Sequence, residues 1–138
     1  NLQITSLGIG TAASGTTGEI RAANAITSYY SDERLKTKVG DIENALDKVM
    51  QLSGFLYKEN EKAKQLGFNN TKTQVALSAQ DVQRVQPEAV QPAPFDTNPD
   101  GTSISGENYL TVQYEKLIPL LVEAIKEIKQ QVDELKAR

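Results

Sequence analysis

The last third of the chain carries its clearest hydrophobic pattern. Apolar residues recur there at alternating spacings of three and four, as at the a and d positions of a coiled coil. These six residues, called the seam below, are Ile118, Leu121, Ile125, Ile128, Val132 and Leu135. Isoleucine or valine fills every a position, and isoleucine joins leucine at d, a composition that shifts preference from dimers towards trimers. We therefore predict a helix over residues 112–137 that forms a trimeric coiled coil through the seam.

The N-terminal half of this helix has a wider apolar face. Leu117 and Ala124 widen it, so we expect this half to pack on its own domain as well. Pro119 falls inside the first two predicted turns, where its ring would clash with the carbonyl four residues back, so we predict a kink. The alternative is an amphipathic helix that packs only on its own domain, because three heptads is the minimum length for a coiled-coil prediction.

The middle of the chain predicts a small α+β domain. Asp41 can cap a helix, whose apolar positions at helical spacing are Ile42, Ala45, Leu46, Val49 and Leu52. Ser53 and Gly54 end this helix. We then expect a strand at 55–57, a projecting polar helix and loop over 58–72, a buried strand at 75–77, and a helix at 79–85 that Pro87 ends.

Residues 86–108 predict a second protrusion. They contain Pro87, Pro92, Pro94 and Pro99. Asp100-Gly101 is a hairpin-turn signal, and the flanking strands would cover 90–95 and 103–110. Prolines restrict the first of these strands to a sheet edge.

Residues 1–30 have a different pattern, rich in Gly, Ala, Ser and Thr and nearly free of charge. Short strands are expected at 2–4, 19–21 and 25–27. The glycine-containing stretches 7–10 and 14–18 are expected to interrupt them. Such a segment cannot bury a face by itself. It fits the end of a β-structured fibre in which several chains share one core, and the alternative is a flexible linker.

Composition narrows the function classes. The 138 residues suffice for one compact domain, or a small domain with an extended segment. A hydrophobic content of 38% with 6% aromatic residues is thin for a monomeric core, so association is expected. A net charge of −3 without a basic patch argues against nucleic-acid binding. No apolar run approaches the ~20 residues of a membrane span. The chain starts at an asparagine, so we expect it to be the C-terminal piece of a longer protein.

The absence of cysteine and histidine is also informative. It excludes disulfides, cysteine nucleophiles, histidine bases and the usual zinc sites, so no metal or cofactor is expected.

Candidate chemistry lies where the two compositions meet, at residues 29–36. Ser31 is a hydroxyl nucleophile candidate, and Lys36 is an amine base candidate. A Ser–Lys pair can perform acyl transfer if the lysine is neutral. An ordinary lysine, with a pKa of ~10.4, is protonated at pH 7, and burial lowers that pKa. Lys36 can therefore act only if folding or assembly buries it. By itself the pair is weak evidence, since such a run is usually a solvated helix start.

The charged neighbours of this pair, Asp32, Glu33 and Arg34, bear on the same question. A carboxylate close to Lys36 would keep the lysine charged. Arg34 would either lower the pKa of Lys36 or pair with that carboxylate.

The surrounding motifs resemble one family. Ser31-Asp32-Glu33-Arg34-Leu35-Lys36 follows the β-rich segment, and three further blocks come in the same order, at 41–48, 76–90 and 112–126. Over about three quarters of its length, the chain resembles the S74 self-cleaving peptidases. These are the C-terminal intramolecular chaperone domains of phage tail fibres and tailspikes, with relatives in endosialidase tailspikes and myelin regulatory factor.

The resemblance implies a single-turnover serine endopeptidase with a Ser31–Lys36 dyad that cuts between Tyr30 and Ser31. Ser31 Oγ would attack the carbonyl of Tyr30, giving an ester that water hydrolyses; a cut in another subunit's strand stays open. Oxyanion donors are needed. The sequence does not identify them, and backbone amides or the side chains of Asn44 or Gln80 are candidates.

The resemblance also implies the biological role. Residues 31–138 would trimerise, hold the upstream fibre chains in register while they fold, and then be released. The protein would be a tail-fibre precursor of the virion, assembled in the host cytoplasm. Its partners would be two further copies and the upstream fibre chain, with no nucleic acid and no membrane. The alternatives are a structural trimerisation domain that stays attached, and an adaptor whose long helix binds a partner helix.

Overall fold

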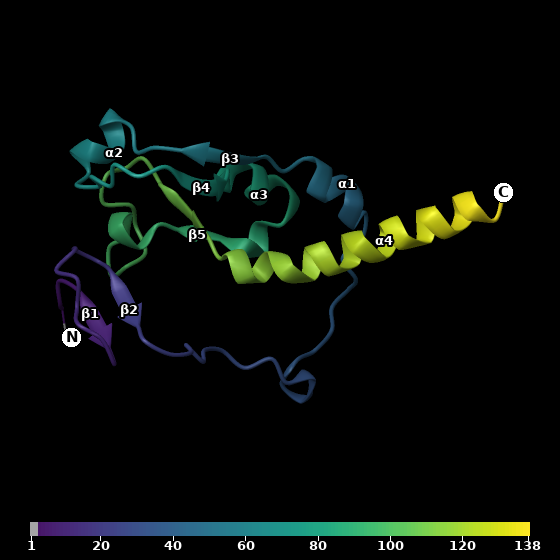
Figure 1. Ribbon diagram of the computed structural model, residues 1–138, viewed down its shortest axis with the longest axis horizontal. Helices are drawn as coiled ribbons and strands as arrows, with labels where there is room; N and C mark the ends of the chain where they lie inside the picture. Colours follow the sequence, from purple (N-terminus) through teal and green to yellow (C-terminus); the bar gives the residue numbers. More distant parts are fainter. Residues whose placement is uncertain (1–2) are drawn as a thin grey trace. The chain divides into compact units, whose positions relative to one another are not determined.

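The first of two compact units is a short β-structured segment followed by an extended chain. The computed structural model describes residues 3–138, and the units comprise residues 1–39 and 40–138. In the first unit, β1 (Leu7–Ile9) and β2 (Ile20–Ala22) pair in parallel (Figure 1). The turn after β1 packs so closely on Gly8 that an added Cβ would lie 2.3 Å from the Thr11 carbonyl oxygen. Only glycine fits there.

Three expectations for this segment need correction. Residues 7–9 were expected to interrupt the strands but form β1. Residues 25–27, expected to be a strand, form none. Residues 3 and 4 are also outside any strand, and residue 2 lies outside the described part of the chain. The expected strand at 19–21 is present as β2, displaced by one residue. The physical reason is pairing: a short extended segment becomes a strand only where a neighbour accepts its hydrogen bonds.

The second unit is a mixed α and β domain, as expected. Its strands form two antiparallel pairs, β3 with β4 and β5 with β6. In chain order the elements are α1 (Ala45–Met50), β3 (Gly54–Tyr57), α2 (Glu61–Gln65), β4 (Gln74–Leu77), α3 (Ala79–Val85), β5 (Val90–Pro92), β6 (Leu110–Val112) and α4 (Ile118–Lys136). Short 3₁₀ turns follow α3, follow β5 and precede α4. The C-terminal half of α4 extends beyond the other elements of this unit (Figure 1).

The core of the second unit is small. Its buried cluster consists of Ala45, Val82, Ala89, Leu117, Leu120 and Ala124. Half of these residues are alanines, and Leu120 and Val82 are the largest fully buried side chains among the described residues. The expectation that Leu117 and Ala124 pack on their own domain is confirmed. A core of this size buries little apolar surface. Because apolar burial is the dominant favourable term in folding, this core contributes only a small free energy of folding.

Helix α1 begins later than expected, and its cap comes from another helix. Asn44, not Asp41, occupies the N-cap position; its backbone is left-handed with a φ of 52°, and its side chain makes no capping hydrogen bond. Glu127 of α4 replaces that cap. Its Oε1 and Oε2 accept hydrogen bonds from the amides of Ala45 and Leu46, each at 2.8 Å. The two residues in contact, Ala45 and Glu127, are 82 positions apart, so the sequence around Asn44 does not predict this cap.

The start of α4 also corrects the prediction. Val112 belongs to β6, and a 3₁₀ turn (Tyr114–Leu117) separates that strand from the helix. Pro119 thus lies in the first turn of α4. There the missing N–H breaks no helical hydrogen bond, so the proline starts the helix instead of bending it. The predicted kink is wrong for this reason.

Both predicted protrusions are present as hairpins with short strands. The arm between β3 and β4 contains α2, as expected. Val75 of β4, expected to be buried, is 74% exposed, and it pairs with the equally exposed Leu56. An antiparallel sheet can pack on the core with one face and leave the other face in water. Val75 lies on the exposed face, which explains the error. In the second arm, β5 and β6 are shorter than the predicted strands. Residues 93–109 contain a 3₁₀ turn (Pro94–Asp96), an isolated bridge between Thr97 and Ser103, and further turns.

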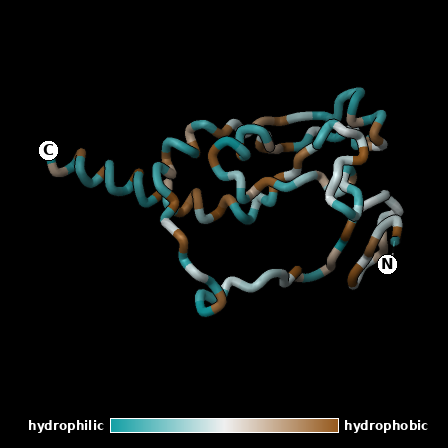
Figure 2. The backbone as a smooth tube through the Cα atoms, turned by 180° about the vertical axis from the view of Figure 1, so that it is seen from behind, coloured by the Kyte–Doolittle hydropathy of each residue, from teal (hydrophilic) through white to brown (hydrophobic). Residues whose placement is uncertain are grey.

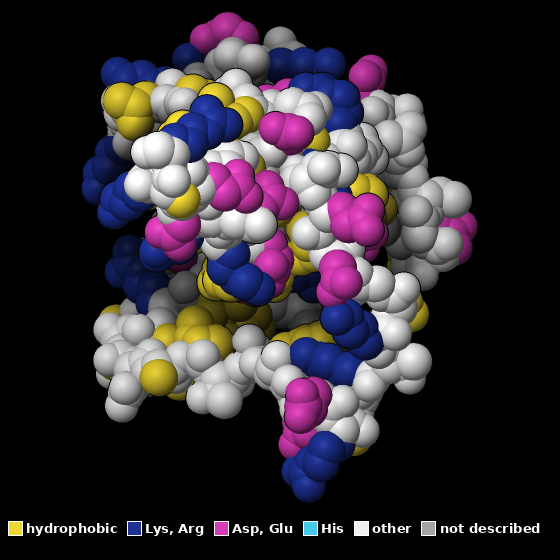
Figure 3. Space-filling model, turned by 90° about the vertical axis from the view of Figure 1, so that its right-hand side faces the viewer, with side chains coloured by type: hydrophobic (Ala, Val, Ile, Leu, Met, Phe, Trp, Pro, Cys, Tyr) yellow, Lys and Arg dark blue, Asp and Glu magenta, His cyan; other side chains and the backbone are white. Residues whose placement is uncertain are grey.

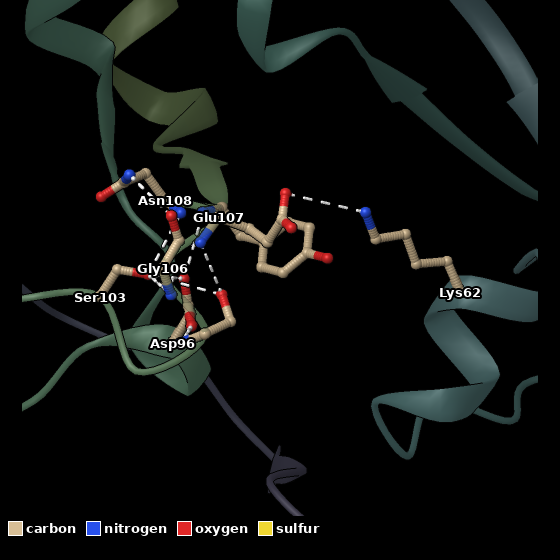
Figure 4. Close-up of polar contacts among 8 residues, drawn as sticks. Lys62, Asp96, Ser103, Gly106, Glu107 and Asn108 are labelled. Carbon is tan, nitrogen blue, oxygen red and sulfur yellow. Dashed lines mark hydrogen bonds and ion pairs between the residues drawn. The ribbon is translucent and has the colours of Figure 1, made fainter.

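One buried aspartate organises the tip of the second arm (Figure 4). Asp96 Oδ2 accepts hydrogen bonds from Ser103 Oγ at 2.7 Å and from the Tyr109 amide at 3.2 Å. Its Oδ1 accepts one from the Ser105 amide at 2.7 Å. These hydrogen bonds lower the pKa of Asp96 to about 2, with the Ser103 hydroxyl as the largest cause. The arm is therefore shaped by polar contacts and not by a core of its own.

The two arms meet through an ion pair and aromatic contacts. Lys62 of α2 lies 3.9 Å from Glu107 and 5.6 Å from the ring centre of Tyr109. Phe95 packs edge-on against Phe68, with ring centres 5.0 Å apart. None of the helices in residues 3–138 has the length and apolar character of a membrane span.

Candidate functional site

A single turn of 3₁₀ helix lies between the two candidate catalytic residues. It covers Glu33–Leu35, and Asp32 caps it by accepting a hydrogen bond from the Arg34 amide at 2.9 Å. Aspartate is a favoured N-cap because its carboxylate satisfies a free backbone N–H. The turn ends at Lys36, whose amide donates to the Glu33 carbonyl at 3.1 Å. The local sequence therefore reverses the chain between Ser31 and Lys36.

This reversal brings the two side chains together. Lys36 Nζ donates a hydrogen bond to Ser31 Oγ at 2.8 Å. That distance lies within the range expected between a nucleophile and its base. Both residues are exposed in the single chain. The pair therefore has the contact that the chemistry needs but lacks the dry surroundings.

The carboxylate of Asp32, close in sequence to Lys36, is paired with Arg34. Its guanidinium holds Asp32 in a fork, with Nη2 at 2.7 Å from Oδ2 and Nε at 3.0 Å from Oδ1. The hydrogen bonds from Arg34 lower the pKa of Asp32, and the charge of Lys36 contributes a smaller part. Of the two alternatives for Arg34, pairing with the carboxylate is the one observed. The guanidinium therefore competes with Lys36 for this carboxylate.

The peptide bond between Tyr30 and Ser31 lies next to an unusual backbone conformation. Tyr29 has a φ of 54°, in the left-handed region. The rings of Tyr29 and Tyr30 are stacked, with centres 5.4 Å apart and planes at 15°. Both rings are exposed. No sequence signal predicts this geometry, since a bulky residue rarely adopts positive φ.

The seam of α4 faces away from its own domain. Its six residues are between 38% and 65% exposed, whereas Leu117, Leu120 and Ala124 on another side of the helix are at most 4% exposed. Figure 2 shows hydrophobic positions recurring along the otherwise hydrophilic C-terminal part of α4. The helix thus has two apolar sides, and its own domain covers one of them. The alternative in which the seam packs on its own core does not describe this chain.

The remaining candidates are placed as follows. Asn44 is the N-cap residue of α1, and Gln80 lies in α3, where its side chain contacts Ser78. Both belong to the second unit, whereas the dyad belongs to the first. Residues 3–138 contain no cluster of three or more histidine, cysteine, aspartate or glutamate side chains that could hold a metal ion. On the face shown in Figure 3, lysine and arginine are interspersed with aspartate and glutamate.

Comparison with known proteins identifies related chains. The family described as "Chaperone of endosialidase" (Peptidase S74) matches residues 31–91. The long tail fiber protein Gp37 of Enterobacteria phage K3 is 39% identical over 116 residues, which cover 83% of this chain and 8% of the relative. The same protein of phage T2 matches equally well. That of phage M1 is 33% identical over 108 residues, covering 77% of this chain and 38% of the relative. The chain therefore spans less than a tenth of the length of the first two relatives.

Proposed function

We propose that the chain, which matches the chaperone-of-endosialidase family and the long tail fiber protein Gp37, is a phage tail-fibre chaperone domain that releases itself from the fibre by autoproteolysis. The cut falls between Tyr30 and Ser31. The observation that carries this proposal is the 2.8 Å contact between Lys36 Nζ and Ser31 Oγ. The family match supports it, because that match begins at residue 31, the residue that would start the released fragment.

The proposed reaction is an acyl shift followed by hydrolysis. Neutral Lys36 takes the proton of the Ser31 hydroxyl, and Oγ forms a bond to the carbonyl carbon of Tyr30. The bond from that carbon to the Ser31 nitrogen then breaks, and Lys36 returns the proton to the nitrogen. Water hydrolyses the resulting ester, which leaves a carboxylate at Tyr30 and the free hydroxyl of Ser31. Asn44, Gln80 or backbone amides remain the proposed oxyanion donors.

Assembly supplies the environment that the single chain lacks. We propose a homotrimer held by the seam, since six apolar side chains on one side of α4 are exposed without a cover from their own domain. Association that removes water from Lys36 favours the neutral amine. The chaperone role follows from the same assembly. Three joined domains keep the upstream chains together while slow, non-local β-structure forms, and cleavage then removes the scaffold, which makes unfolding hard to reverse.

Domain limits and location are part of the proposal. Residues 1–30 are the end of the fibre, residues 31–138 the chaperone, and residues 112–137 contain the trimerisation helix. The precursor assembles in the host cytoplasm, the fibre part enters the virion, and the partners are two further copies and the upstream chain. We propose no cofactor, nucleic acid or membrane as a partner.

Mass spectrometry of the purified protein over time tests the reaction. The parent should yield a fragment beginning at Ser31. Ser31→Ala should stay whole because it lacks the attacking oxygen. Lys36→Arg should also stay whole, since arginine keeps the positive charge but cannot give up its proton. Both variants should keep the oligomeric state of the parent, because neither residue lies on the seam.

Lys36→Arg is the more decisive variant. If Lys36 only holds the junction in shape through a polar contact, arginine serves equally well and the fragment appears at the parental rate. That result would remove Lys36 as the base. A parent that never yields the fragment would instead support the non-cleaving trimerisation domain.

A further inference from the structure

The turn between Ser31 and Lys36 depends on a carboxylate that is also able to keep the lysine charged. Asp32 caps this turn by accepting a hydrogen bond from the Arg34 amide at 2.9 Å, and such a cap stabilises the turn that brings the dyad together. The positive charge of Lys36 is one of the causes that lower the pKa of Asp32, so the carboxylate lies within electrostatic range of the amine. A carboxylate at that range favours the ammonium over the neutral amine.

Arg34 holds both oxygens of this carboxylate. Its Nη2 donates to Oδ2 of Asp32 at 2.7 Å, and its Nε lies 3.0 Å from Oδ1 and 3.2 Å from Oδ2. Two guanidinium nitrogens on one carboxylate make a strong pair with a specific geometry. With its amide included, Arg34 makes four hydrogen bonds to the Asp32 side chain. The amine of Lys36 is hydrogen-bonded to Ser31 Oγ at 2.8 Å instead.

Two further charged groups, Glu33 and Lys38, lie beside Lys36. They line the same open hollow as Arg34, Lys36 and Thr37. Their charges are opposite in sign, so their effects on the charge of Lys36 oppose each other. Asp32 differs from both because the cap fixes its carboxylate on the turn itself. The charge that most needs a fixed partner is therefore that of Asp32.

We propose that Arg34 is a positioning residue for self-cleavage: by holding the carboxylate of the cap, it keeps Lys36 paired with Ser31. This inference rests on the proposed function. Without the guanidinium, an oxygen of Asp32 is open to the amine, and an ion pair replaces the contact with the serine. Removal of water during assembly strengthens that ion pair. The lysine then stays an ammonium and cannot take the serine proton, although the cap of the turn is intact.

The pH dependence of release by the full chain tests this role. Arg34→Gln should raise the pH midpoint for release of the Ser31 fragment by about one unit, which slows release about tenfold at a pH well below the midpoint. Asp32→Asn keeps a capping side chain but removes its charge. Adding Asp32→Asn to Arg34→Gln should reverse the rise of the midpoint, because the cap then offers Lys36 no carboxylate.

The matched control is Arg84→Gln. Arg84 forms an ion pair with Asp81 three positions away in α3, in the second unit. Its loss removes the same charge and the same kind of pair at a distance from the dyad in sequence, so the midpoint should stay at the parental value. Light scattering over the same pH range should give every variant the oligomeric state of the parent.

The midpoints decide the proposal. An equal midpoint in Arg34→Gln and the parent overturns it, because the pair would then only stabilise the turn. A raised midpoint that Asp32→Asn does not reverse also overturns it, since Arg34 would then act without Asp32. An equal rise in Arg84→Gln overturns it because net charge would be the cause. A parent that stays uncut at every pH overturns the proposed autoproteolysis itself, whereas a cut parent with an unchanged midpoint in Arg34→Gln overturns only the role of Arg34.

Discussion

Single carboxylates do much of the local shaping in this chain. Asp32 caps the turn at the junction and holds Arg34. Asp96 gathers two backbone amides and a serine hydroxyl at the tip of the second arm. In both cases donors that favour the charged carboxylate lower its pKa. The stability of these turns therefore depends on pH in a predictable direction.

The arm around Asp96 should loosen in acid. Its pKa is lowered from 3.8 to about 2, so its contribution to stability is fully present above the unfolded value and is lost as the pH falls from about 4 to 2. The protection factors of the Ser105 and Tyr109 amides, which correct for the intrinsic pH dependence of exchange, should fall over that range. Asp96→Asn should exchange faster at pH 7, because an amide group offers one acceptor atom where the carboxylate offers two.

The control for this prediction is Asp100→Asn. Asp100 contacts Thr102 locally in an exposed turn, so this variant should leave the exchange at Ser105 and Tyr109 close to that of the parent. Equal protection of these two amides in Asp96→Asn and in the parent at pH 7 would contradict the role assigned to Asp96.

Among the secondary-structure elements, α4 has two distinct apolar sides. Leu120 is fully buried against its own domain, and the adjacent Leu121 on the seam is 44% exposed. The two leucines differ by one position in sequence and by about 100° around the helix. The same substitution at each site therefore separates the stability of the domain from the stability of the assembly.

Leu120→Ala should destabilise the fold whatever its oligomeric state. Removing a fully buried leucine side chain costs about 2–5 kcal/mol, which should lower the urea midpoint at every protein concentration. Leu121→Ala should instead leave the unfolding of the dilute monomer nearly unchanged and weaken association. Equal effects of the two variants on the dilute monomer would show that the seam is part of the domain's own core.

At the scale of the whole molecule, the buried core is small. Its buried cluster is half alanine, and large apolar side chains along α4 are exposed. Exposed apolar surface arranged at a coiled-coil spacing supports the proposed interface between helices. The proposed trimer would bury the seam and give Lys36 the surroundings in which it can act as a base.

Charges placed in the seam should stop both assembly and cleavage. Ile125→Asp combined with Ile128→Asp puts carboxylates where three helices would meet, so light scattering at micromolar concentration should show monomers. The Ser31 fragment should not appear, because Lys36 then stays solvated. Gln130→Asp is the control, since this exposed residue lies off the seam; it should remain trimeric and be cut. A double variant processed at the parental rate would uncouple cleavage from assembly, and a monomeric parent would contradict the trimer itself.

Local patterns were enough to predict several features correctly. These include helix α3 at its observed bounds, the strand β3, and the packing of Leu117 and Ala124 on their own domain. The closeness of Ser31 and Lys36 belongs to the same group, because one capped 3₁₀ turn between them makes their contact. Each of these features depends on residues within a few positions of one another.

Contacts between distant segments decided what local patterns could not. Glu127 sets the start of α1 from another helix, and β6 takes Val112 out of the long helix by pairing it with Val90. Pro119 consequently starts α4 instead of bending it. Side chain hydrogen bonds across an arm make Asp96 its centre. The physical reason is the same in each case: a backbone or carboxylate group takes the partner that folding brings to it, and sequence spacing carries no record of that partner.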